Sequence, residues 1–204
     1  MNLPNKLTLM RIVLVPVFMV FAGLGQIGTP VYNRMFYLVA AIVFAVASFT
    51  DYLDGHLARK WNIVTDFGKF ADPLADKLLT TTAFLYMMHD GVCSPVVLVI
   101  ILAREFAVSG LRMVAASAPG GKVIAANMWG KVKTVLQMLV IILYYVLAAF
   151  APADAIGAVS LISMGLCWLV AAVTLISGAK YLWDNRSFIN LSLIHISEPT
   201  RRYA

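Results

Sequence analysis

Charged residues are scarce in this chain. Only 13% of its 204 residues are Asp, Glu, Lys or Arg and 61% are hydrophobic, whereas a typical soluble domain has about 25% charged and about 45–50% apolar residues. The mean hydropathy is correspondingly high, at +0.85. This composition excludes an ordinary soluble domain built around one apolar core.

Cysteine is nearly absent as well. The two cysteines, Cys93 and Cys167, are too few for a disulfide framework or a zinc site. The formal net charge is +6, but the basic residues are scattered through apolar segments and form no solvated stripe. The sequence therefore predicts no nucleic-acid partner.

Four stretches contain no charged residue at all: 12–33, 35–50, 134–153 and 155–179. A transmembrane helix needs about 20 apolar residues, with a range of about 17–25. Three of the stretches are long enough, and the shortest suffices if its helix extends into flanking charged residues. We therefore predict an all-α, polytopic membrane protein.

Breaks at Gly, Pro and charge clusters divide the chain into six predicted transmembrane helices, which form one domain over residues 1–188. The predicted ranges are 7–25, 35–59, 70–89, 94–117, 126–149 and 156–182. Nearly all basic residues fall on one side of this arrangement, and the opposite side has only Arg34. By the positive-inside rule we expect both termini to be cytoplasmic, in the plasma (inner) membrane of a bacterium.

The sequence changes character after Ile189. The segment LSLIHISEPTRRYA has no membrane period and no continuity with the helix before it. We expect residues 189–204 to be a foreign or disordered tail, and we exclude them from the predicted fold and site.

Four aspartates interrupt the apolar pattern in the middle of the chain. Asp51 and Asp54 are three positions apart. Asp72 and Asp76 are four apart, so each pair projects from one face of a helix. Four carboxylates on two facing helices repel one another unless divalent cations lie between them. Oxygen ligands of this kind suit Mg²⁺ or Mn²⁺.

Small and basic residues accompany these aspartates. Gly55 and Ala58 remove side-chain bulk, so that a ligand can approach the helix, and Gly68 has the same permissive character. Arg59 supplies a guanidinium suited to a phosphate oxygen. An alternative interpretation of Asp72 is a helix N-cap, with the proline that follows it at the first helical position.

A second polar cluster lies in the predicted fourth and fifth helices. Arg104 and Arg112 are eight positions apart, about two helical turns, and so share a face. Lys131 and Lys133 are two apart, so only one of them is expected to point inward. We interpret these residues as a cationic pocket for a second, anionic substrate. The alternative is that the side chains extend to lipid head groups at the membrane surface.

The aspartate pattern reads Asp51-x2-Asp54-Gly55-x2-Ala58-Arg59-x8-Gly68-x3-Asp72-x3-Asp76. It resembles the signature of the CDP-alcohol phosphatidyltransferase family. The resemblance implies a six-helix fold and a homodimer. It also implies that the first three aspartates bind a pair of metal ions, Mg²⁺ or Mn²⁺, with Asp76 at the edge of the pair as the general base.

The segments NLPNKLTLMR, AREFAVSGLR and GKVKTVLQM resemble those members of the family whose acceptor is glycerol 3-phosphate. The implied substrates are CDP-diacylglycerol and glycerol 3-phosphate, with the acceptor phosphate held in the cationic pocket. The residues implied to bind the CDP-linked lipid are Asn5, Thr8, Arg11, Gly55, Ala58, Arg59 and Gly68. The alternatives are another acceptor, such as inositol phosphate or serine, and a cation-coupled transporter whose intramembrane acids bind the ion.

Overall fold

The computed structural model of this chain describes residues 3–27, 30–61, 66–117 and 128–186, with side chains over 8–27, 33–51, 74–115 and 128–186. The described residues form six α-helices, one short 3-10 helix and no strand. The α-helices are α1 (Leu3–Ile27), α2 (Pro30–Trp61), α3 (Asp66–His89), α4 (Pro95–Ser117), α5 (Met128–Phe150) and α6 (Ile156–Asp184). The 3-10 helix η1 (Ala153–Ala155) precedes α6.

The predicted all-α fold with six helices is confirmed, but three helices begin earlier than predicted. α1 begins at Leu3 rather than at 7, α2 at Pro30 rather than at 35, and α3 at Asp66 rather than at 70. Asp72 therefore lies inside α3, and its interpretation as an N-cap is wrong. The helix continues through this polar stretch because charges inside a bundle can find partners on neighbouring helices. Residues 189–204 lie outside the described residues.

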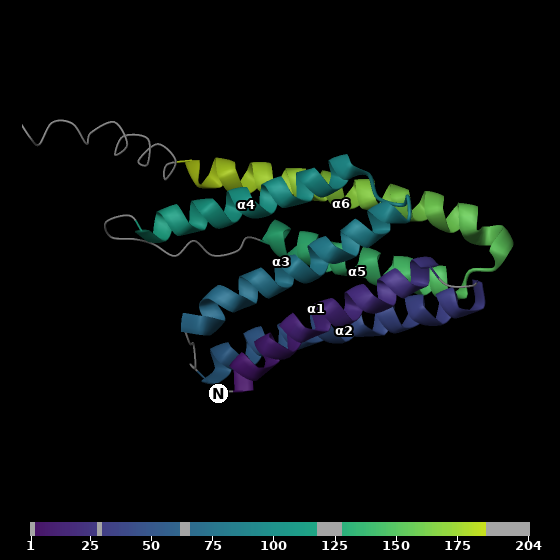
Figure 1. The fold of residues 1–204 in the computed structure, drawn as a ribbon. Helices are drawn as coiled ribbons and strands as arrows, with labels where there is room; N and C mark the ends of the chain where they lie inside the picture. Colours follow the sequence, from purple (N-terminus) through teal and green to yellow (C-terminus); the bar gives the residue numbers. More distant parts are fainter. Residues whose placement is uncertain (1–2, 28–29, 62–65, 118–127, 187–204) are drawn as a thin grey trace, which may run out of the picture.

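The helices run side by side along one long axis (Figure 1). α1 packs against α2 and α3, α2 packs against α5, and α6 packs against both α4 and α5. In Figure 1 the α1–α2 pair and the α4–α6 pair lie on opposite sides of the bundle, with α3 and α5 between them. Successive helices alternate in direction, so residues far apart in sequence meet at the same end.

Aromatic side chains fill the centre of the bundle. Phe18 of α1 is fully buried, and its ring centroid lies 5.8 Å from that of Phe44 of α2 and 5.4 Å from that of Tyr145 of α5. The rings meet edge to face, the geometry that their quadrupoles favour. This aromatic core joins α1, α2 and α5 at the centre of the bundle.

Four of the helices are long and apolar enough to cross a membrane: α1, α2, α5 and α6. Their outer faces expose large apolar side chains, such as Val20 at 58%, Leu139 at 57% and Leu161 at 70%. An exposed apolar surface of this extent is typical of a protein that contacts lipid. The helices α3 and α4 carry the charged residues Asp76, Arg104 and Glu105 and pack among the other four.

Candidate active site at the charged end of the bundle

Five helices bring ionisable side chains together at one end of the bundle, which we call the charged end. It comprises Arg11 of α1, Asp51 of α2, Asp76 of α3, Glu105 of α4 and Lys133 of α5. Asp76 interacts electrostatically with the other four. These residues span much of the sequence, so only the antiparallel packing of the helices can place them together.

The first contact in this cluster joins α1 to the aspartate motif. An Nη1 of Arg11 lies 2.7 Å from Oδ1 of Asp51, and the Arg11 side chain is only 1% exposed while that of Asp51 is 36% exposed. A buried guanidinium is unfavourable without an anionic partner, so the pair fixes the start of α1 against α2. Thr8, one turn before Arg11, is also buried.

The other motif residues lie on the same two helices. Asp54, Gly55, Ala58 and Arg59 are within α2, and Gly68 and Asp72 are within α3; Asn5 is within α1. Their side chains lie outside the described ones. The described carboxylates, Asp51 and Asp76, are on facing helices and interact with each other, as the predicted pairing of the two aspartate pairs requires.

The residues present fit a divalent cation. Among the described side chains, which do not include those of Asp54 and Asp72, no group of three His, Cys, Asp or Glu residues is close enough to hold a metal ion. Asp51 and Asp76 supply carboxylate oxygens, the donors that Mg²⁺ and Mn²⁺ prefer. Like charges on facing helices also favour a cation between them.

The second predicted cluster is organised by Glu105. Its Oε1 accepts a hydrogen bond of 2.5 Å from Nζ of Lys133 and one of 3.3 Å from Nη1 of Arg104. Lys77 of α3 is a further electrostatic neighbour of Glu105, and its Nζ donates a 2.6 Å hydrogen bond to Oγ of Ser109. Glu105 therefore has three basic neighbours, Lys133, Arg104 and Lys77. The cluster of these four residues has an excess of positive charge.

The two lysines of the predicted pocket point in different directions. Lys133 is buried, at 3% exposure, and binds Glu105. Lys131 is exposed. The prediction that only one of them points inward is confirmed, and the inward residue is Lys133.

The arginines of α4 both contact α6. Nη2 of Arg104 donates a 2.9 Å hydrogen bond to Oγ of Ser177, and Nε of Arg112 donates one of 3.1 Å to the hydroxyl of Tyr181. The guanidinium of Arg112 also lies over the Tyr181 ring, 5.5 Å from its centroid. The prediction that Arg104 and Arg112 share a face is confirmed, because Ser177 and Tyr181 are one turn apart on one face of α6.

A glycine allows this close approach of α4 and α6. A Cβ atom added to Gly178 would lie 2.9 Å from Cγ of Arg104, closer than the two atoms can pack. The absence of a side chain at Gly178 thus allows the Arg104 side chain to pack against α6.

The prediction from sequence missed Glu105, Ser177, Gly178 and Tyr181. Glu105 had a signal, because an acid within an apolar helix is expensive and is usually functional or paired. Ser177 and Tyr181 had none: Ser177 lies in the longest uncharged stretch of the chain, 155–179, and Tyr181 follows Lys180 directly. Only the packing of α6 on α4 reveals them.

Comparison with known proteins agrees with the motif. The family model of the CDP-alcohol phosphatidyltransferases matches residues 1–177. The chain belongs to this family. The matched region covers α1 to α5 and most of α6. Both the aspartate motif and the basic cluster around Glu105 therefore lie within it.

Three relatives carry the name CDP-diacylglycerol--glycerol-3-phosphate 3-phosphatidyltransferase. The Bacillus subtilis protein is 39% identical over 90% of this chain and 95% of its own length. The Rickettsia felis protein is 35% identical, over 88% of this chain and 93% of its own length. The Pseudomonas fluorescens protein is 33% identical, over 99% and 95%. The similarity to this group of family members therefore extends over nearly the whole chain.

Proposed function

We propose that this protein transfers the phosphatidyl group of CDP-diacylglycerol to the 1-hydroxyl of sn-glycerol 3-phosphate, forming phosphatidylglycerophosphate and CMP. The observation that carries the proposal is that Asp76 interacts electrostatically with both the carboxylate of Asp51 and the buried ammonium of Lys133. A motif carboxylate thus lies beside a cationic group that can hold an anionic acceptor. Family membership and the names of the relatives support the same pair of substrates.

The reaction needs one base and one leaving group. Asp76 accepts the proton of the acceptor hydroxyl while the oxygen of that hydroxyl forms a bond to the phosphorus of the phosphatidyl group. The bond between that phosphorus and the bridging oxygen of the diphosphate breaks, and CMP departs with the electron pair. Asp76 can do this because it interacts with Lys133, which is assigned to the acceptor phosphate, as well as with Asp51.

The acceptor phosphate is assigned to Arg104, Arg112 and Lys133. Glu105 and α6 hold Arg104 and Lys133 in place, so their positions are set before the substrate arrives and less conformational freedom is lost on binding. Lys131, being exposed, is assigned to the membrane surface instead of this site.

The residues that would hold divalent metal ions are Asp51, Asp54, Asp72 and Asp76. Bound there, Mg²⁺ or Mn²⁺ would supply charge neutralisation for the diphosphate and for the departing CMP. Asn5, Thr8, Arg11, Gly55, Ala58, Arg59 and Gly68 are assigned to the CDP-linked lipid. The ion pair of Arg11 with Asp51 supports this assignment, since it brings α1 against the motif.

The site also suggests how the protein is oriented. Nearly all Lys and Arg residues belong to the end of the bundle that carries the aspartates, and Arg34 is at the other end. We assign the charged end and both termini to the cytoplasmic side of a bacterial inner membrane, where a soluble acceptor can meet a lipid donor. We assign a homodimer on the family resemblance.

One experiment tests this function: release of CMP from CDP-diacylglycerol by the purified protein, with and without EDTA, across a panel of acceptors. We expect release that requires Mg²⁺ or Mn²⁺ and glycerol 3-phosphate. Equal rates with serine or an inositol phosphate would contradict the proposed acceptor. Absence of CMP release with every acceptor would contradict the transferase reaction itself and favour an ion-binding role for the carboxylates.

A further inference from the structure

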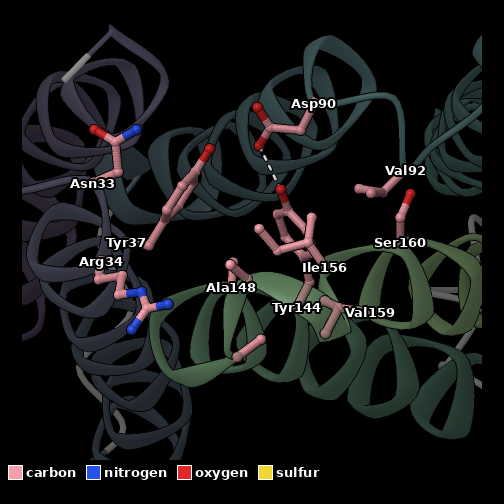
Figure 2. Close-up of a pocket in the computed structure, with 12 residues that line it drawn as sticks. Asn33, Arg34, Tyr37, Asp90, Val92, Tyr144, Ala148, Ile156, Val159 and Ser160 are labelled. Atoms are coloured by element: carbon pink, nitrogen blue, oxygen red, sulfur yellow. Dashed lines mark hydrogen bonds between the residues drawn. The ribbon is translucent and has the colours of Figure 1, made fainter. Parts of the chain in front are cut away.

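A cavity of about 430 Å³ lies at the opposite end of the bundle, which we call the tyrosine end after Tyr37 of α2 and Tyr144 of α5 (Figure 2). It lies between α2, α5, the start of α6 and the turn that follows α3. Its size falls within the range of about 300–1,000 Å³ that is usual for small-molecule sites. Neither the aspartate motif nor the acceptor cluster contributes to its lining.

The cavity is too far from the charged end to belong to the active site. Arg34, which lines it, is on the same helix as Asp51. At 1.5 Å per residue the two lie about 25 Å apart along α2, close to the thickness of about 30 Å of a bilayer's hydrocarbon core. If the charged end meets one membrane surface, this cavity opens near the other.

Its walls carry two opposite charges that are not paired with each other. Arg34 makes no hydrogen bond or ion pair with any residue that the structure describes, and it is the only lysine or arginine among the residues that line the cavity. Figure 2 shows its guanidinium at the side of the cavity away from Asp90. A ligand can therefore approach this cation without breaking an existing contact.

The negative charge belongs to Asp90, whose side chain is 11% exposed. Its carboxylate accepts hydrogen bonds from the hydroxyl of Tyr144 at 2.5 Å and from Nε2 of Gln26 at 2.8 Å. Both donors are neutral, and the only described basic atom near it is Nδ1 of His89, at 3.9 Å. The donors hold the carboxylate in place while leaving its charge without a strong counter-ion.

We propose that this cavity binds the head group of a zwitterionic phospholipid that has a primary ammonium. The phosphodiester lies at Arg34 and the ammonium at Asp90, while apolar residues such as Ile156 and Val159 contact the glycerol and the start of the acyl chains. An anionic ligand would leave the negative charge of Asp90 without a counter-ion. A cationic ligand would leave the positive charge of Arg34 without one. The apolar part of the lining and the place of the cavity near a membrane surface favour a lipid over a soluble zwitterion.

Binding of defined lipids to the full-length protein tests this site. The detergent-purified chain is titrated with phosphatidylethanolamine, phosphatidylcholine and phosphatidylglycerol, and bound lipid is counted by native mass spectrometry. We expect the affinity to fall in that order, because the choline ammonium has no N–H to donate and glycerol has no positive charge. Arg34→Gln should weaken binding of phosphatidylethanolamine at least about tenfold through loss of a charge-assisted contact.

Two further variants keep the test decisive. Asp90→Asn should remove the preference for phosphatidylethanolamine over phosphatidylglycerol. If that variant does not fold, Ala148→Leu, which places a larger side chain in the cavity lining, should weaken binding of all three lipids. Arg186→Gln is the matched control, because this exposed arginine follows α6 at the charged end and should not alter lipid binding.

Competition separates this site from the catalytic one. CDP-diacylglycerol should not displace phosphatidylethanolamine, and Arg34→Gln should keep normal release of CMP, so failure of the lipid site and failure of the transferase assignment give different results. Soluble glycerophosphoethanolamine should bind more weakly than the intact lipid. Equal affinity of the wild type for the three lipids, equal binding of the soluble head group, or unchanged binding in both Arg34→Gln and Ala148→Leu would overturn the proposal.

Discussion

The two ends of the helix bundle hold their acidic residues in different ways. At the charged end, Asp51 pairs with Arg11 and Glu105 pairs with Lys133 and Arg104. At the tyrosine end, Asp90 is held by Gln26 and Tyr144, which are neutral. Both arrangements satisfy partly buried carboxylates, but with groups of different chemistry.

This difference matters for what each end can do. Because Lys133 and Arg104 share the carboxylate of Glu105, an incoming phosphate can become the partner of one of them while Glu105 keeps the other, so that no buried charge is left alone. Neutral hydrogen bonds to a single carboxylate mainly fix a structure, here the junction of α1, the turn after α3 and α5. Substitutions at the charged end should therefore alter turnover, and substitutions at the tyrosine end should leave turnover unchanged and alter stability or lipid binding.

The largest effect is expected at Asp76. Asp76→Asn removes the proposed base but keeps the shape of the side chain, so turnover should fall by about 10²–10⁴-fold while CDP-diacylglycerol still binds. Initial rates of CMP release and equilibrium binding of the donor measure the two effects. Asp184→Asn, an exposed carboxylate at the end of α6, is the control and should behave as wild type.

Asp51→Asn sharpens the assignment of Asp76. This change removes a proposed metal ligand, so the requirement for Mg²⁺ should rise and donor binding should weaken together with turnover. Near-normal release of CMP by Asp76→Asn would show that another group takes the proton.

A smaller effect is expected from the lysine pair of α5. Lys133→Met should raise the KM for glycerol 3-phosphate about tenfold or more, because a buried charge-assisted contact is lost, with little change in the KM for the lipid donor. Lys131→Met, two positions away and exposed, should change either constant less than twofold. Similar effects of both substitutions would place the acceptor outside the cluster around Glu105.

The close approach of α6 gives a third test. Gly178→Ala should lower the activity several-fold, because its new Cβ meets Cγ of Arg104 at 2.9 Å and moves a guanidinium whose position is important. Gly165→Ala in the same helix has nothing within 4 Å of its Cβ and should retain full activity. If both variants have the same KM for glycerol 3-phosphate as wild type, α6 does not position Arg104.

The smallest effect on activity is expected at the tyrosine end. Tyr144→Phe removes the hydrogen bond to Asp90 and should lower the free energy of unfolding by about 1–2 kcal/mol, with CMP release unchanged. Tyr145→Phe is the matched control, because the Tyr145 hydroxyl has no hydrogen-bond partner in the described part of the chain. Thermal unfolding in detergent compares them, and loss of activity in Tyr144→Phe would show that the two ends are coupled.

Much of the fold could be predicted from the positions of the charges. Uncharged stretches such as 134–153 and 155–179 indicated where α5 and α6 would form, because the membrane sets a minimum length for an apolar helix. The starts of α1, α2 and α3 were predicted less well, since each predicted helix began directly after a basic residue, Lys6, Arg34 or Lys69. A helix tolerates such charges when other helices supply partners, and a single segment does not show those partners.

The candidate site, like the fold, could be predicted only as far as it depends on residues that are close together in the sequence. The sequence by itself determined the membrane class, the six helices and the aspartate pattern, because composition and spacing along one helix are local properties. Only the tertiary structure decided that Lys133 and not Lys131 points inward, that Glu105 joins the basic residues, and that Ser177 and Tyr181 hold the arginines. Those facts depend on which helix faces which, and helix packing is a property of the whole bundle that no single segment encodes.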